Sequence, residues 1–133
     1  MPNITEFATT KLSLHRSEMA PDGCAVHPLL GLASCTMAHF KLAPGETSRA
    51  VVHRTVEELW FVLSGRGELW RKQGTREDVA VLEPGVCATL PRGTQFQFRA
   101  SSTEAVEIVA VSIPPWPGNE EAEFVRGAWL SSE

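Results

Sequence analysis

Turn-forming residues recur at short, even intervals from Pro44 onward, and this spacing constrains the fold more than any other feature of the sequence. Proline fixes φ and glycine tolerates positive φ, so such pairs interrupt regular structure. The turns are expected at 44–45, 64–67, 73–74, 84–85, 92–93 and 101–102. Their separation leaves no room for long helices and predicts an antiparallel sandwich or barrel. The predicted strands are residues 34–42, 48–54, 58–63, 68–72, 79–82, 86–90, 95–100 and 105–113.

The strand predicted at 58–63 has an unusual pattern. Side chains alternate between the faces of a strand, so Glu58, Trp60 and Val62 share one face. The other face carries Leu59, Phe61 and Leu63. Both faces are apolar apart from Glu58, so we expect a strand that is covered on both sides, with a half-buried carboxylate at its start. His53 lies five residues upstream of this carboxylate, which indicates a candidate site.

The 133 residues are predicted to form a single domain, 1–133, because a chain of this length can bury one core. An irregular N-terminal arm at 1–33 precedes a barrel at about 34–113, and a tail rich in proline and tryptophan follows at 114–133. The prolines near 114 lack the N–H that a central strand needs, so an extended tail is expected. Trp116 and Trp129 favour burial, so the tail is expected to pack on the barrel or on a second subunit.

Composition narrows the partners and the location. A net charge of −4 without a basic cluster argues against nucleic acid as a partner. No apolar run approaches the ~18 residues of a membrane span, and the first residues lack the basic and apolar regions of a signal peptide. We therefore expect no membrane partner and a cytoplasmic location. Three cysteines without C-x-x-C spacing are expected to be free thiols in a reducing compartment.

Two segments bounded by glycines resemble the paired motifs of the cupins, a superfamily of small double-stranded β-helix barrels. The first motif, G-x5-H-x-H-x3,4-E-x6-G, is matched at Gly45, His53, Glu58 and Gly65. The second, G-x5-P-x-G-x2-H-x3-N, is matched at Gly85, Pro91 and Gly93. The resemblance covers about 34–113 and implies an all-β, single-domain, cupin-like jelly-roll barrel. It also implies a homodimer, because cupins commonly pair through strand edges and exchanged N-terminal arms.

The resemblance does not extend to the metal site of the family. Cupin motifs supply three histidines and a glutamate, a ligand set suited to iron, manganese, nickel or zinc. The first histidine position holds Val51, the second-motif histidine falls on Phe96, and the asparagine falls on Ala100. Only His53 and Glu58 remain, so no cofactor is expected. A divalent transition metal would need a nonstandard third ligand, for which His39 on the preceding strand is the candidate.

The remaining features predict a pocket and leave its use open. By strand parity, Trp60, Phe96 and Phe98 are expected to line the interior beside His53 and Glu58. Val51, at the first histidine position of the motif, is expected in the same pocket. These two residues are either a hydrogen-bonded buried pair or an acid–base pair that acts on a ligand. The leading hypothesis is a cupin that binds a small organic molecule without the standard metal. The alternatives are a metal-dependent oxygenase or isomerase, a metal-free epimerase-type enzyme with His53 as base, and a filled barrel with a structural or oligomeric role.

Overall fold

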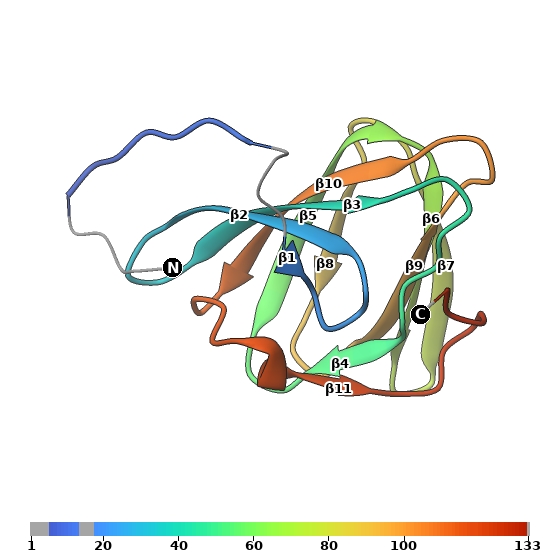
Figure 1. The fold of residues 1–133 in the computed structure, drawn as a ribbon. Coiled ribbons are helices and arrows are strands. Elements are labelled where there is room, and N and C mark those ends of the chain that lie inside the picture. Colours follow the sequence, from blue (N-terminus) through green and yellow to red (C-terminus); the bar gives the residue numbers. More distant parts are fainter. Residues whose placement is uncertain (1–5, 14–17, 133) are drawn as a thin grey trace.

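The computed structural model describes residues 6–13 and 18–132, and its strands, which begin at Glu18, form two antiparallel sheets facing each other (Figure 1). The six-stranded sheet has the order β1-β2-β3-β10-β5-β8. Its strands are β1 (Glu18–Met19), β2 (Ala25–Gly31), β3 (Thr36–Leu42), β10 (Val106–Ile113), β5 (Glu57–Gly65) and β8 (Cys87–Leu90). The five-stranded sheet has the order β11-β4-β9-β6-β7. Its strands are β11 (Ala122–Phe124), β4 (Val51–His53), β9 (Gln95–Ala100), β6 (Gly67–Gln73) and β7 (Arg76–Leu82).

This arrangement is the all-β jelly roll that the sequence predicted, and each predicted strand has a counterpart. The largest boundary differences are β4, which is shorter than the predicted 48–54, and β7, which is longer than 79–82. The sequence did not predict β2, which lies within the expected N-terminal arm and pairs with β3 along its length. Pro28 breaks the strand signal of this segment, and the register of the pair shifts directly after it.

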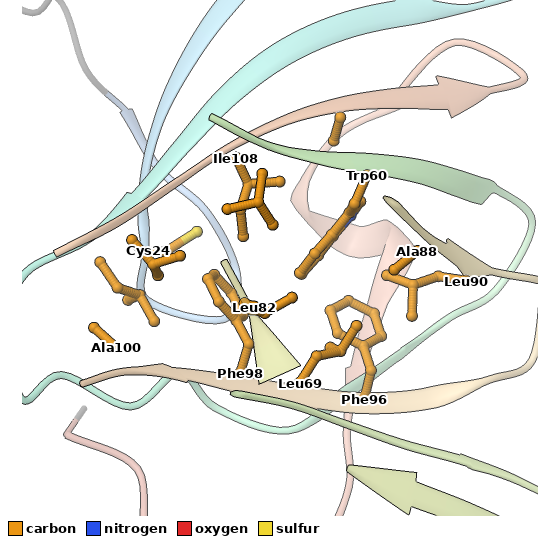
Figure 2. Close-up of a cluster of buried hydrophobic side chains, with 14 of the residues drawn as sticks. Cys24, Trp60, Leu69, Leu82, Ala88, Leu90, Phe96, Phe98, Ala100 and Ile108 are labelled. Atoms are coloured by element: carbon orange, nitrogen blue, oxygen red, sulfur yellow. The ribbon is translucent and has the colours of Figure 1, made fainter. Parts of the chain in front are cut away.

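The core lies between the two sheets and is built from alternating residues of the central strands. Trp60 and Val62 of β5 face Phe96 and Phe98 of β9, and all four are almost fully buried. Figure 2 shows Trp60, Phe96 and Phe98 pointing toward one another from opposite sheets. The inward-facing alternation predicted for β5 and β9 therefore holds.

The second face of β5 is not covered, which corrects one sequence prediction. Leu59, Phe61 and Leu63 are 51%, 45% and 46% exposed, although both faces were expected to be buried. The neighbouring strand β10 places Val109 opposite Phe61 and Val111 opposite Leu59, so an apolar surface continues across two strands. We call Leu59, Phe61, Leu63, Val109 and Val111 the β5–β10 face.

Gly65 allows the chain to turn from β5 into β6. Its φ of 84° lies in the left-handed region that favours glycine. A Cβ at this position would lie 1.7 Å from the carbonyl oxygen of Ala105, so no larger residue fits without backbone movement. The glycine of the first motif is thus required both by conformation and by close approach.

The tail returns to the barrel and covers the outside of β9. The Gln97 side-chain amide donates to the backbone oxygens of Ser48 and Trp129, at 2.8 and 2.9 Å, and its oxygen accepts the Trp129 N–H at 2.9 Å. The Trp129 ring lies 4.1 Å from the Arg99 guanidinium carbon. These contacts show the tail packing on its own barrel, one of the two expected alternatives. No helix in the described part of the chain is long and apolar enough to cross a membrane.

Candidate functional site

A cavity of about 410 Å³ opens at one end of the barrel. Strands of both sheets form its walls, and the turn before β2 and the segment 116–122 form its rim. The segment is held against the barrel because β11 pairs with β4, with Ala122 opposite His53 (Figure 1). The pocket lining includes Asp22, Phe40, Val51, His53, Glu58, Trp60, Phe96, Ser112, Trp116 and Asn119.

Aromatic rings form a continuous series along the cavity. The ring centroids of Phe40 and Trp60 are 6.1 Å apart, and those of Trp60 and Phe96 are 5.7 Å apart. His53 continues the series at 5.1 Å from Phe96 and 5.2 Å from Trp116. All four pairs meet edge to face, which is a favourable geometry for aromatic side chains. The pocket therefore has a rigid apolar wall drawn from β3, β4, β5, β9 and the tail.

Glu58 brings a buried carboxyl group to this wall. Its two oxygens accept hydrogen bonds from the Trp60 indole N–H at 3.1 Å and from the Ser112 hydroxyl at 2.7 Å. Burial raises the pKa of Glu58, and the two hydrogen bonds only partly oppose this effect. Glu58 therefore holds a proton at a higher pH than an exposed glutamate does.

His53 lies in the same pocket but does not bond to Glu58, so the hydrogen-bonded pair considered from the sequence does not form. Neither ring nitrogen of His53 has a hydrogen-bond partner among the described residues. Burial lowers the pKa of His53, and the carboxylates of Asp22 and Glu121 oppose this effect only in part. A neutral imidazole with free nitrogens can accept or relay a proton from a bound molecule.

Asp22 is a pocket residue that the sequence analysis missed. It lies in the turn between Pro21 and Gly23, and this turn folds over the cavity. One carboxyl oxygen accepts the Cys24 N–H at 3.1 Å, and the Asp22 carbonyl accepts the Arg49 N–H at 2.7 Å. Burial raises the pKa of Asp22, and nearby Glu58 raises it further. No local pattern in the sequence connects Asp22 to the strands that carry His53 and Glu58.

The residues predicted to line the pocket are mostly brought together. Val51, Trp60 and Phe96 line the cavity with His53 and Glu58, and Val51 pairs directly with Phe96 across β4 and β9. Phe98 is fully buried deeper in the core, against Trp60, and is not part of the cavity wall. Its position next to Phe96 on the same face made the two indistinguishable by parity.

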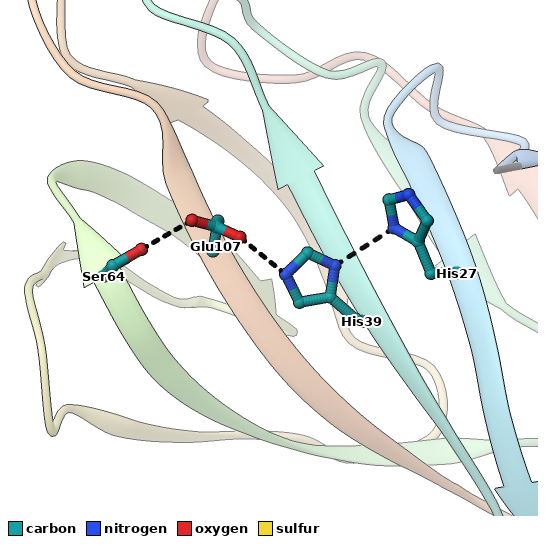
Figure 3. Close-up of polar contacts among 4 residues, drawn as sticks. All are labelled: His27, His39, Ser64 and Glu107. Atoms are coloured by element: carbon teal, nitrogen blue, oxygen red, sulfur yellow. Dashed lines mark hydrogen bonds and ion pairs between the residues drawn. The ribbon is translucent and has the colours of Figure 1, made fainter. Parts of the chain in front are cut away.

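His39 lies away from the pocket, which corrects its proposed role as a third metal ligand. It points to the outer side of the six-stranded sheet, where its Nε2 lies 2.9 Å from Glu107 and its Nδ1 lies 3.1 Å from Nδ1 of His27 (Figure 3). Ser64 donates to the other Glu107 oxygen at 2.8 Å. Burial lowers the pKa of His39, so this contact is a neutral histidine donating to a carboxylate.

The donor set in the pocket does not fit the metal centre of the family. Val51 and Phe96 offer no ligand atom, so only His53 and Glu58 of the four motif positions carry one. Across the described residues, no three side chains of histidine, cysteine, aspartate or glutamate are grouped so that they could hold a metal ion. The chemistry available in this pocket is therefore that of two buried carboxyl groups and a neutral imidazole against an aromatic wall.

Two facing antiparallel sheets with a pocket at one end define a jelly-roll barrel of the double-stranded β-helix type. Residues 38–112 match the family model described as Cupin domain, which is more than half of the chain. The chain belongs to the cupin family. No curated protein matches the chain in sequence.

Solved structures of the same fold differ widely in sequence. The Streptomyces nucleoside dehydratase Pac13 is 16% identical, with a TM-score of 0.67 over 90% of this chain and 92% of that chain. A predicted oxalate decarboxylase from Thermotoga maritima is 19% identical, with a TM-score of 0.58 over 68% of this chain and 80% of that chain. The capsular polysaccharide assembling protein CapF of Staphylococcus aureus is 15% identical, with a TM-score of 0.69 over 84% of this chain and 34% of that chain. These likenesses show the fold.

Proposed function

We propose that this cupin binds a small organic molecule in the pocket between His53, Glu58 and the aromatic wall. One observation carries the proposal: the barrel end holds a cavity of about 410 Å³ where a filled barrel would have packed side chains. This volume lies within the range of about 300–1,000 Å³ that is usual for ligand pockets. Apolar walls with a few convergent polar groups are also typical of such sites. The cavity disfavours the alternative of a filled barrel with a purely structural role.

The likeness to Pac13 supports the proposal on grounds of size. Structures of variants of that Streptomyces protein were solved with uridine. One of these variants is 17% identical to this chain, and the match covers 90% of this chain and 93% of that chain. A barrel of this size can therefore hold a molecule as large as a nucleoside. Uridine is accordingly one of the compounds to test.

A second candidate function is metal-free proton transfer on the bound molecule, as in an epimerase-type enzyme. The observation that favours it is the unbonded, neutral His53 in a pocket with two carboxyl groups of raised pKa. A neutral imidazole can take a proton from a substrate carbon or hydroxyl, and a protonated carboxyl group can return one. The alternative of a metal-dependent oxygenase or isomerase is disfavoured, because His39 is on the other side of the sheet and Val51 and Phe96 supply no ligand.

A thermal-shift screen of small organic molecules tests the binding proposal. A compound at 100 times its dissociation constant stabilises the folded protein by about 2.7 kcal/mol, which a melting curve detects readily. We expect the shift to be lost or reduced in His53→Ala and retained in His27→Ala. These variants truncate a histidine in the pocket and a histidine on the outer side of the sheet. The proposal is contradicted if no compound of a broad screen stabilises the protein. It is also contradicted if His27→Ala removes the thermal shift and His53→Ala does not.

The same pair of variants tests the enzyme candidate once a ligand is known. If His53 is the base, His53→Ala abolishes turnover while its melting temperature in the absence of ligand stays close to that of the native protein. A variant that folds and still turns the compound over excludes His53 as base.

We also infer that the protein forms a homodimer through the β5–β10 face. Three large apolar side chains of β5 are about half exposed there, and Val109 and Val111 extend the surface. A second copy presents the same surface, so a two-fold pair buries both at once. Phe61→Glu is expected to give a monomer in sedimentation analysis, whereas Val79→Glu on the other sheet keeps the dimer. A native protein that sediments as a monomer at micromolar concentration refutes this inference.

The cytoplasmic location stays an expectation. Cys24, Cys35 and Cys87 are all free thiols, and a reducing compartment preserves that state.

A further inference from the structure

The charges at the pocket are unbalanced. Three acidic residues line it, Glu18, Asp22 and Glu58, and two of them are buried. No lysine or arginine of the described chain lines the pocket, and none of the ion pairs found among the described residues involves Asp22 or Glu58. Buried carboxyl groups in proteins are usually paired with a cationic side chain or a metal ion. Here the described part of the chain provides neither partner.

His53 does not supply the missing positive charge. Burial lowers its pKa, so its imidazole is the neutral form around pH 7. The donors that do reach Glu58, the Trp60 indole and the Ser112 hydroxyl, are neutral as well. These hydrogen bonds hold the carboxyl group in place without compensating its charge when it ionises.

The aromatic wall stands beside this uncompensated carboxyl group. The Trp60 indole N–H is bonded to Glu58, so an electron-rich ring and the acid are neighbours in the pocket. Trp116 and Phe96 continue the wall on either side of His53. Aromatic rings attract organic cations through their quadrupole, and the attraction grows when water is excluded. Aromatic rings are the features by which proteins recognise quaternary ammonium ligands, and a nearby carboxylate adds the attraction of opposite charges.

We propose that the ligand of this pocket is an organic ammonium ion, a small molecule that carries one positively charged amine on an apolar or ring-bearing body. The amine lies between Asp22 and Glu58 and supplies the counter-charge that the chain lacks, and the body fills the apolar part of the cavity. This rests on the proposed small-molecule function of the pocket and adds the charge class of the ligand. Among the described residues, no three side chains of histidine, cysteine, aspartate or glutamate are grouped to hold a metal ion, which suits a larger organic cation better.

Three indole compounds of similar size and different charge test the proposal by isothermal titration calorimetry at pH 7. Tryptamine is the cation, tryptophol the neutral analogue and indole-3-acetate the anion. We expect tryptamine to bind at least tenfold more tightly than tryptophol, and indole-3-acetate to bind more weakly than either. Because an ammonium ion favours ionised carboxylates, tryptamine binding is also expected to release protons, which appears as a dependence of the measured heat on the ionisation enthalpy of the buffer.

Two near-isosteric variants assign the effect to the buried acids. Glu58→Gln and Asp22→Asn are each expected to weaken tryptamine at least tenfold and to change tryptophol less than threefold. Glu107→Gln, on the outer side of the sheet, serves as the matched control and is expected to leave both affinities unchanged. Either pocket variant alone is sufficient for this test if the other fails to fold.

The possible failures are distinguishable. If tryptophol or indole-3-acetate binds as tightly as tryptamine, the pocket binds small molecules and the charge class is wrong. The charge class is also wrong if none of the three binds while an uncharged or anionic compound from the wider screen does. If no compound of any charge binds, both this inference and the proposed function fail.

Discussion

Replacing Glu58 by glutamine should make the protein more stable at neutral pH. The amide keeps an oxygen to accept the Trp60 N–H and an NH₂ group to donate to the Ser112 hydroxyl, so packing and hydrogen bonding are preserved. What it removes is a carboxyl group that must ionise in a buried position. Burial raises the pKa of Glu58 in the folded state above the ordinary value of 4.5. The unfolded chain therefore loses this proton at a lower pH than the folded protein does.

The sign and the magnitude follow from proton linkage. Between the unfolded and folded pKa values the folded state holds more protons, so the native protein loses stability as the pH rises. Below about pH 4.5 both states are protonated and the difference between Glu58→Gln and the native protein is constant. Above that pH the free energy of unfolding of Glu58→Gln rises relative to that of the native protein. The maximum slope is about 1.4 kcal/mol per pH unit for one proton. The gain levels off once the pH exceeds the raised pKa.

Glu107→Gln is the matched control, because the same substitution on the same sheet should have the opposite effect. The Ser64 hydroxyl bond lowers the pKa of Glu107, and the His39 bond acts in the same direction. A lowered pKa contributes stability above pH 4.5 that is lost as the pH falls through the lowered value. Glu107→Gln is therefore expected to be less stable than the native protein at neutral pH, and the deficit should shrink in acid.

Urea unfolding followed by tryptophan fluorescence between pH 3 and 8 measures both curves, and the four tryptophans provide the signal. The comparison is valid where the slope of stability against urea is the same in all three proteins. The reasoning is refuted if the Glu58→Gln difference is flat with pH, or if it falls as the pH rises. Either result would mean that the Glu58 carboxyl group is solvated in the folded protein.

Two further predictions concern the framework. Gly65→Ala is expected to cost about 2–5 kcal/mol, from about 1–2 for positive φ and about 1–3 for the overlap with Ala105, as measured by urea unfolding. Gly45 also has a positive φ, but a Cβ there would have open space, so Gly45→Ala should lose only about 1–2 kcal/mol, the part due to φ. Equal losses of stability in the two variants would contradict the close approach at Gly65. Gln97→Ala removes three hydrogen bonds, one to Ser48 and two to Trp129 of the tail. It is expected to lower the free energy of unfolding by about 2–4 kcal/mol and to speed proteolysis of the tail. Gln95→Ala, on the same face of β9, is the control and should change neither the free energy of unfolding nor the rate of proteolysis. If Gln97→Ala is as stable and as resistant to protease as the native protein, the tail is held by other contacts.

The fold was predictable because its signals are local. Turn residues at short intervals mark the ends of the strands, and glycines such as Gly65 adopt the positive φ that the turns require. The prediction failed where the signal was not local. β2 contains Pro28 and reads as irregular, yet it is stabilised by pairing with β3. Gln97 looks like a solvated residue of an outer face, but the tail buries it from thirty residues away.

The site was predictable only along the strands. Period-two alternation predicted Trp60 and Phe96 on inner faces, and the position of His53 just upstream of Glu58 indicated the site. The cupin resemblance added Val51. Alternation shows which face of a strand a side chain is on, but not how far along the barrel it lies from the pocket. Phe98 was therefore predicted to line the pocket, although it is buried in the core. Asp22 was missed because its contact with the pocket depends on where the turn before β2 folds, and that is set by tertiary packing.

The register of β4 and β9 brings two of the positions without a metal-binding side chain next to each other. Val51 and Phe96 occupy two of the positions at which the cupin motifs place histidines, and they are direct partners across the two strands. A histidine at only one of these two positions would face an apolar side chain. Its ring nitrogen would then lack a hydrogen-bond partner, which would lower the stability of the fold by about 1–3 kcal/mol. With an apolar residue at both positions the pair packs, and the His53 ring meets the Phe96 ring edge to face at 5.1 Å. The acid that remains, Glu58, then lacks any positive partner from the described chain, and this imbalance is what directs the pocket toward a cationic ligand.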